Sequence, residues 1–130
     1  MVKQAVDVSS VVDTYVAMLK RELGVERVIL SDVQTAGVDG EPTDIWFIVV
    51  TSAFEGMAFN ERIGKLAVLG LDVSPLVQAW GYTPDELTAV YRGKSPDLLL
   101  PQMLNGSREV YVRHGATPLP VLRKTARRKS

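Results

Sequence analysis

The sequence contains no cysteine, and this absence excludes structural disulfides and thiolate metal sites. No apolar run approaches the roughly 18 residues that a membrane-spanning helix needs. The first ten residues, MVKQAVDVSS, place an acid among short apolar side chains, so we expect no secretory signal. Histidine occurs once, as His114, without a second histidine that would complete a zinc site. We therefore expect a cytoplasmic protein.

Acidic residues are missing from the C-terminal end. The last eight residues hold five basic side chains and no acid: Arg123, Lys124, Arg127, Arg128 and Lys129. Residues 1–122 carry ten basic against fifteen acidic side chains, a net charge of −5. The acidic body argues against a broad nucleic-acid-binding face on the domain. The basic end can make weak, salt-sensitive contacts with nucleic acid or with an acidic protein partner, or it can simply add solubility.

The chain has the length and composition of one globular domain. Its 130 residues are 46% hydrophobic and 23% charged, which is ordinary for a protein with a packed core. We expect a domain over residues 1–113 and a basic, flexible tail over residues 114–130, where the chain becomes interrupted by glycine and proline.

Hydrophobic periodicity and capping residues predict alternating helices and strands. The first helix is expected to begin at Ser9 or Ser10 and to end at Gly24. The segment TPDE at residues 83–86 combines a capping box with a proline at the first helical position. Further helices are expected over residues 54–69 and 96–104, and strands over 25–30, 44–51, 71–77 and 108–113. The order predicts an α/β or α+β fold, a small mixed sheet flanked by helices.

The most informative segment is 28–50, VILSDVQTAGVDGEPTDIWFIVV. It predicts a strand, a polar connection over residues 31–43 and a second strand rich in aromatic and β-branched residues. Because side chains alternate along a strand, Asp44 and Trp46 are expected on the same face. Later in the chain, Trp80 and its neighbours at 81–82 suggest either a contact surface or the edge of the core.

Residues 10–113 resemble the minimal nucleotidyltransferases of the polymerase-beta-like superfamily. In that family, a strand ends in a glycine-serine turn, the next strand carries two aspartates, and a following strand carries a third. The matching segments are VIL at 28–30, Gly37, TDI at 43–45, LDV at 71–73, YTPDEL at 82–87 and NGSREVY at 105–111. The resemblance implies a nucleotidyltransferase-like fold, with Asp44 and Asp72 as the remaining catalytic and metal-binding candidates.

The departures from the family pattern fall on its chemistry. Asp32 and Val33 stand where the family has glycine and serine, and Trp46 stands where it has its second aspartate. Magnesium is a hard ion that requires oxygen ligands, and an indole offers none. Trp46 can instead be an apolar plug, a stacking platform or a partner contact, and Asp32 a turn-capping acid or a displaced metal ligand.

The leading hypothesis is a catalytically degenerate nucleotidyltransferase-fold protein, an inactive homologue that acts as a binding or regulatory module and needs no cofactor. Members of the family work beside a helical partner, often as the antitoxin half of a two-protein pair, so the resemblance implies a protein partner or a homo-oligomer. The alternative is an active transferase that uses magnesium and ATP. It would move a nucleoside monophosphate from a nucleoside triphosphate to a protein or small-molecule hydroxyl, with Asp44 and Asp72 holding the metal.

Overall fold

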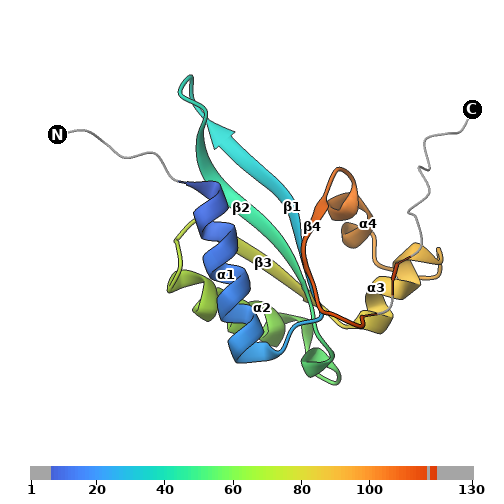
Figure 1. Ribbon diagram of the computed structural model, residues 1–130. Coiled ribbons are helices and arrows are strands. Elements are labelled where there is room, and N and C mark those ends of the chain that lie inside the picture. Colours follow the sequence, from blue (N-terminus) through green and yellow to red (C-terminus); the bar gives the residue numbers. More distant parts are fainter. Residues whose placement is uncertain (1–6, 117, 120–130) are drawn as a thin grey trace, which may run out of the picture.

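A four-stranded mixed sheet flanked by helices forms the protein, which confirms the predicted α+β class (Figure 1). The computed structural model describes residues 7–116 and 118–119, so the five basic residues near the C-terminus lie outside the described part. In chain order, the elements are α1 (Val8–Leu23), β1 (Arg27–Ala36), β2 (Glu41–Val50), the 3-10 turn η1 (Ser52–Phe54), α2 (Phe59–Leu71), β3 (Val77–Tyr82), α3 (Pro84–Tyr91), α4 (Leu99–Leu104) and β4 (Arg108–Val112).

The sheet has the strand order β3-β2-β1-β4. Strand β1 pairs antiparallel with both β2 and β4, whereas β2 and β3 run parallel. A short turn suffices between the antiparallel strands β1 and β2, but parallel strands need a crossover, which α2 supplies between β2 and β3. This arrangement places β2 in the interior of the sheet beside β3, so side chains of these two strands share each face of the sheet.

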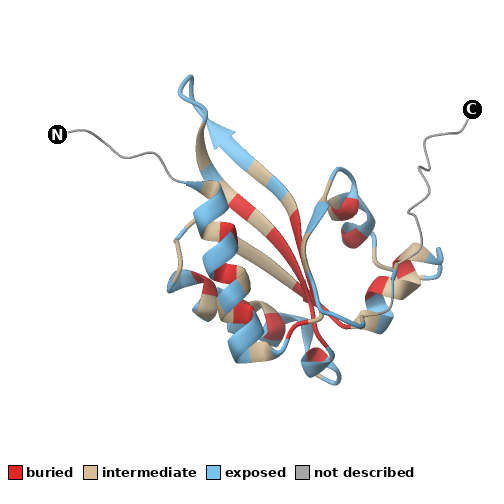
Figure 2. Ribbon diagram, in the orientation of Figure 1, coloured by how far each residue is buried: buried red, intermediate tan, exposed pale blue. Residues whose placement is uncertain are grey.

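The two faces of the sheet bury separate apolar clusters (Figure 2). Because side chains alternate along β2, Phe47 and Val49 pack with α1 and α2, while Ile48 and Val50 pack with α3 and α4. Both faces of the strand are covered, which explains why its sequence is a nearly continuous apolar run. The helices α1 and α2 thus form one layer, and α3 and α4 form the other (Figure 1).

The polar connection predicted over residues 31–43 is instead part of a long β-hairpin. Strand β1 continues to Ala36 and β2 begins at Glu41, with a turn over 37–40 in which Gly37 and Gly40 have φ near +67° and +66°. Glycine suits both positions because positive φ is strained for residues with a Cβ. Much of the outer hairpin is exposed, so its polar side chains resemble those of a loop.

The prediction of a strand over residues 71–77 is wrong. Leu71 is the last residue of α2, Asp72 caps that helix, and the third strand is β3, which begins only at Val77. Gly70 does not end the helix. Its missing side chain allows α2 to approach β3 closely, since a Cβ at this position would lie 2.8 Å from Val77 Cγ1. The helix itself begins at Phe59 rather than at residue 54.

Several predicted helix ends are confirmed by the cap geometry. Thr83 and Glu86 form the expected capping box at the start of α3, and Gly24 ends α1 in the left-handed conformation. The start of α1 differs, because Asp7 rather than a serine is the N-cap, and its side chain accepts the N–H of Ser10. Helix α4 begins at Leu99, and strand β4 lies within the predicted segment.

Candidate functional site

A β-bulge in β1 turns two consecutive polar residues toward the α4 side of the sheet. The register shifts between Leu30 and Asp32, and Asp32 then lies opposite Trp46 on β2. Ser31, the extra residue of the bulge, donates a hydrogen bond of 2.7 Å to the carbonyl oxygen of Met103 in α4. Bulges commonly redirect side chains in this way. Here the bulge attaches β1 to α4 and brings Asp32 to the rim of a cavity.

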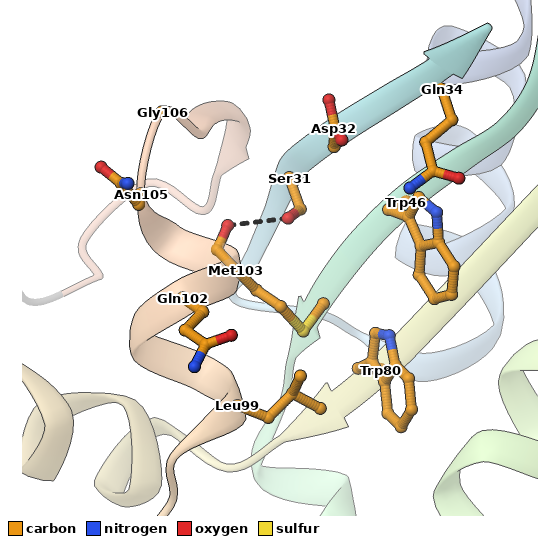
Figure 3. A pocket seen from close by; sticks show the side chains of 10 residues that line it. All are labelled: Ser31, Asp32, Gln34, Trp46, Trp80, Leu99, Gln102, Met103, Asn105 and Gly106. Carbon is orange, nitrogen blue, oxygen red and sulfur yellow. Dashed lines mark hydrogen bonds between the residues drawn. The ribbon is translucent and has the colours of Figure 1, made fainter.

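That cavity lies between the sheet and α4 and has a volume of about 470 Å³ (Figure 3). Side chains from β1, β2, β3 and the α4 region line it, and most of them are polar or aromatic. The lining residues are Ser31, Asp32, Gln34, Trp46, Trp80, Leu99, Gln102, Met103, Asn105 and Gly106. We refer to this space as the indole cavity.

Two tryptophans form the sheet wall of the indole cavity. The rings of Trp46 and Trp80 are stacked, with centroids 6.0 Å apart and an angle of 11° between their planes. Phe59, from the start of α2, stacks on Trp80 with a centroid distance of 5.7 Å. Such a row offers flat π surfaces to a planar or cationic group. Both indoles are half-buried, and they are the only tryptophans in the chain.

The Trp46 indole nitrogen is buried, and within the described residues it has no hydrogen-bond partner. An unpaired buried donor costs about 1–3 kcal/mol, and a phenylalanine at this position would avoid that cost. The nitrogen therefore adds nothing to packing stability. A role for the larger indole surface in the cavity accounts for a tryptophan at this position better than a purely structural plug does.

The two acids predicted as metal ligands lie on different elements. Asp44 lies on β2, half-buried, opposite Gln34 and on the same face as Trp46. Asp72 is exposed, belongs to no strand and follows α2 at its C-terminal end. Strand β3, VQAWGY, has no acid, and its residue opposite Trp46 is Gln78. Within residues 7–116 and 118–119, no three His, Cys, Asp or Glu side chains group as metal ligands.

The α4 side of the cavity was not predicted from the sequence. Trp80 was predicted as either a contact surface or the edge of the core, and Gln102, Met103 and Asn105 were not predicted as site residues. Placing the third strand at Val77–Tyr82 would have revealed Trp80, because alternation puts it on one face with Gln78 and Tyr82. The α4 side of the cavity had no local signal, since it depends on how that helix docks against the bulge of β1.

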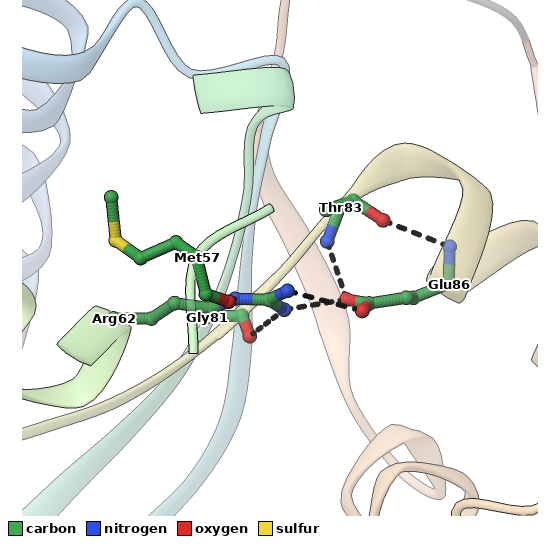
Figure 4. Close-up of polar contacts among 5 residues, drawn as sticks. All are labelled: Met57, Arg62, Gly81, Thr83 and Glu86. Atoms are coloured by element: carbon green, nitrogen blue, oxygen red, sulfur yellow. Dashed lines mark hydrogen bonds and ion pairs between the residues drawn. The ribbon is translucent and has the colours of Figure 1, made fainter. Parts of the chain in front are cut away.

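A buried arginine fixes the strand that carries Trp80 (Figure 4). The guanidinium of Arg62 in α2 donates to both carboxylate oxygens of Glu86 in α3, at 2.6 and 3.2 Å. It also donates to the carbonyl oxygens of Met57 and Gly81, at 3.0 and 3.3 Å. The same carboxylate accepts the N–H of Thr83 at 2.8 Å. These bonds join α2, the end of β3 and α3, and thereby hold Phe59 against Trp80.

Stability is expected to fall in acid partly through Glu86. Burial raises the pKa of its carboxyl, but hydrogen bonds from Arg62 and from the Thr83 backbone outweigh burial and hold it below its usual value of 4.5. The stabilisation is therefore present above about pH 4.5 and is lost as the pH falls through the lower folded-state value. Urea unfolding between neutral pH and about pH 3 measures the effect. The free energy of unfolding should fall less steeply with decreasing pH in Glu86→Gln than in the parent. If the free energy of unfolding fell equally steeply in both proteins, Glu86 would not contribute to the loss of stability in acid.

Comparison with family models, with curated proteins and with solved structures found no match. Among the described residues, no helix has both the length and the apolar character that crossing a membrane requires. The chemistry of the site is therefore inferred from its own side chains.

Proposed function

We propose that this chain is a catalytically degenerate nucleotidyltransferase-fold protein of the cytoplasm that acts as a binding or regulatory module. The observation that carries the proposal is the stacked pair of Trp46 and Trp80 in the wall of the indole cavity. The resemblance assigns position 46 to a metal-binding aspartate, and the residue present there supplies a π surface instead. The face retains a site, but its side chains favour binding a ligand over transferring a phosphoryl group.

The polar side chains of the cavity support binding without metal chemistry. Its lining includes one carboxylate, Asp32, together with the amides of Gln34, Gln102 and Asn105. Nucleotidyl transfer through the family mechanism uses clustered carboxylates that hold magnesium against the phosphates. Asp72, the expected third acid, stands outside the sheet, which favours the degenerate reading of the site.

Apolar side chains beside the cavity are consistent with a protein partner or a second copy of the chain. Leu98 and Leu99 are 81% and 39% exposed, and Phe59 is 36% exposed. Large exposed apolar groups near a cavity are common at protein contacts. By resemblance, the partner would be the helical half of an antitoxin-like pair.

One arrangement favours the alternative of an active magnesium- and ATP-dependent transferase. Asp32 lies directly opposite Trp46, and Asp44 lies two residues before Trp46 on the same face, so two carboxylates from neighbouring strands flank the indole. Such a pair could contribute oxygen ligands to one magnesium ion. If the chain is an active transferase, nucleotide binding should depend on Asp44.

Calorimetric titration with ATP in the presence and absence of magnesium tests the proposal. We expect no saturable, magnesium-dependent heat, because the cavity lining has no basic side chain for the phosphates within residues 7–116 and 118–119, and the family's acid triad is incomplete. Tight binding that requires magnesium and disappears in Asp44→Ala would overturn the degenerate site in favour of the transferase. Asp39→Ala, a change to an exposed acid in the hairpin turn, is the matched control.

A further inference from the structure

The indole cavity carries one negative charge among its described lining residues. Among the described residues, its lining includes the carboxylate of Asp32 and no lysine, arginine or histidine. Asp44 adds a second negative charge on the same sheet face, two residues from Trp46. A triphosphate would therefore bring its negative charges toward acids, and none of the described lining residues is basic to offset them. The electrostatics favour a positively charged ligand.

The indoles add an attraction that is specific for cations. Trp46 and Trp80 are nearly parallel, and tryptophan is the side chain whose ring face attracts a cation most strongly. Among biological cations, the guanidinium group is flat and only weakly hydrated, so it stacks on an aromatic face more readily than a compact ammonium does. The paired rings thus match the shape of a guanidinium as well as its charge.

Hydrogen-bond acceptors complete the match. A guanidinium has five N–H donors and no acceptor, and its fork fits a carboxylate through two parallel bonds. Asp32 supplies a carboxylate at the rim, and the amides of Gln34, Gln102 and Asn105 supply further oxygens (Figure 3). The hydroxyl of Ser31 already donates to Met103, so toward a ligand its oxygen can only accept.

We propose that the indole cavity binds a guanidinium group, stacked on the indole wall and paired with Asp32. This inference rests on the proposed binding function and names its ligand chemistry. The group can belong to a small guanidinium compound or to an arginine side chain of a partner, and both present the same flat cation to the cavity.

Tryptophan fluorescence provides the test, because both tryptophans of the chain line the cavity. Titration with ethylguanidinium should give a saturable change in emission, whereas N-ethylurea, a neutral compound of similar shape, should give none at equal concentration. In the second arm, N-acetylarginine amide is compared with N-acetylcitrulline amide. Tighter binding of the arginine amide than of ethylguanidinium identifies a partner's side chain as the source. Weaker binding identifies a free compound.

Variants separate recognition from non-specific effects. Asp32→Asn keeps the oxygen that accepts the N–H of Val33 and removes the charge, so affinity for ethylguanidinium should fall about tenfold. Asp39→Asn makes the same charge change in the hairpin turn and should leave affinity unchanged. Equal binding of ethylurea, or an unchanged affinity in Asp32→Asn, would overturn the inference. Saturable binding of neutral adenosine alone would overturn the guanidinium but not the binding module, whereas magnesium-dependent ATP binding would overturn both.

Discussion

Replacing Arg62 by methionine should lower the free energy of unfolding by about 3 kcal/mol, because the change leaves partly buried acceptors without their donor. The arginine side chain is 8% exposed and pairs with Glu86, and it also donates to the carbonyl oxygens of Met57 and Gly81. Methionine retains much of the apolar stem, so the loss reports the polar contacts more than the packing. Urea unfolding at neutral pH measures the effect.

Arg21→Met is the control for this experiment. Arg21 also forms an ion pair with a glutamate, Glu22, but both side chains are largely exposed. Exposed pairs contribute about 0–1 kcal/mol, so this variant should differ little from the parent. If Arg62→Met were as stable as Arg21→Met, the bonds that join α2, β3 and α3 would not hold the Trp80 strand in place.

Replacing Trp46 by aspartate should also cost about 3 kcal/mol, through loss of the aromatic contact and the introduction of a third acid. The new carboxylate would lie directly opposite Asp32 and two residues from Asp44 on the same face. The substitution would also remove the ring that stacks on Trp80. The experiment restores the residue type that the family resemblance expects at this position, and thermal or urea unfolding reports its cost.

Trp46→Phe separates the two causes. This variant keeps an aromatic ring and removes the buried, unpaired N–H, so the loss of ring area and the gain from removing the donor oppose each other. We expect its stability to lie within about 1 kcal/mol of the parent. An aspartate variant as stable as the phenylalanine variant would show that the indole does not support the fold.

Local chemistry made some elements predictable. The capping box at Thr83 and the left-handed Gly24 act within a few residues, and both appear as expected. The buried core of β2 was also predictable, since aromatic and β-branched residues cover both of its faces. The hairpin was not, because the side chains of its exposed arm are polar. The prediction that Gly70 ends the helix was wrong for a different reason. In the sequence, a glycine that permits close packing of α2 against Val77 cannot be told from a glycine that ends a helix.

The candidate site was predictable only where one strand carries it. Alternation along β2 correctly placed Asp44 and Trp46 on one face. The position of Trp80 depended on the register of a parallel strand, and that of Met103 depended on tertiary docking against Ser31. Single-sequence patterns contain neither kind of information, so the cavity emerges only when the sheet and α4 are placed together.

We propose that the face carrying Trp46 binds a ligand without metal-dependent nucleotide chemistry. Tryptophan emission during titration with ATP, with and without magnesium, tests it most directly, because both indoles line the cavity and report any occupant. We predict no saturable, magnesium-dependent change in the parent protein. A saturable change that requires magnesium and is lost in Asp44→Ala would contradict the account and establish a nucleotide site on this face.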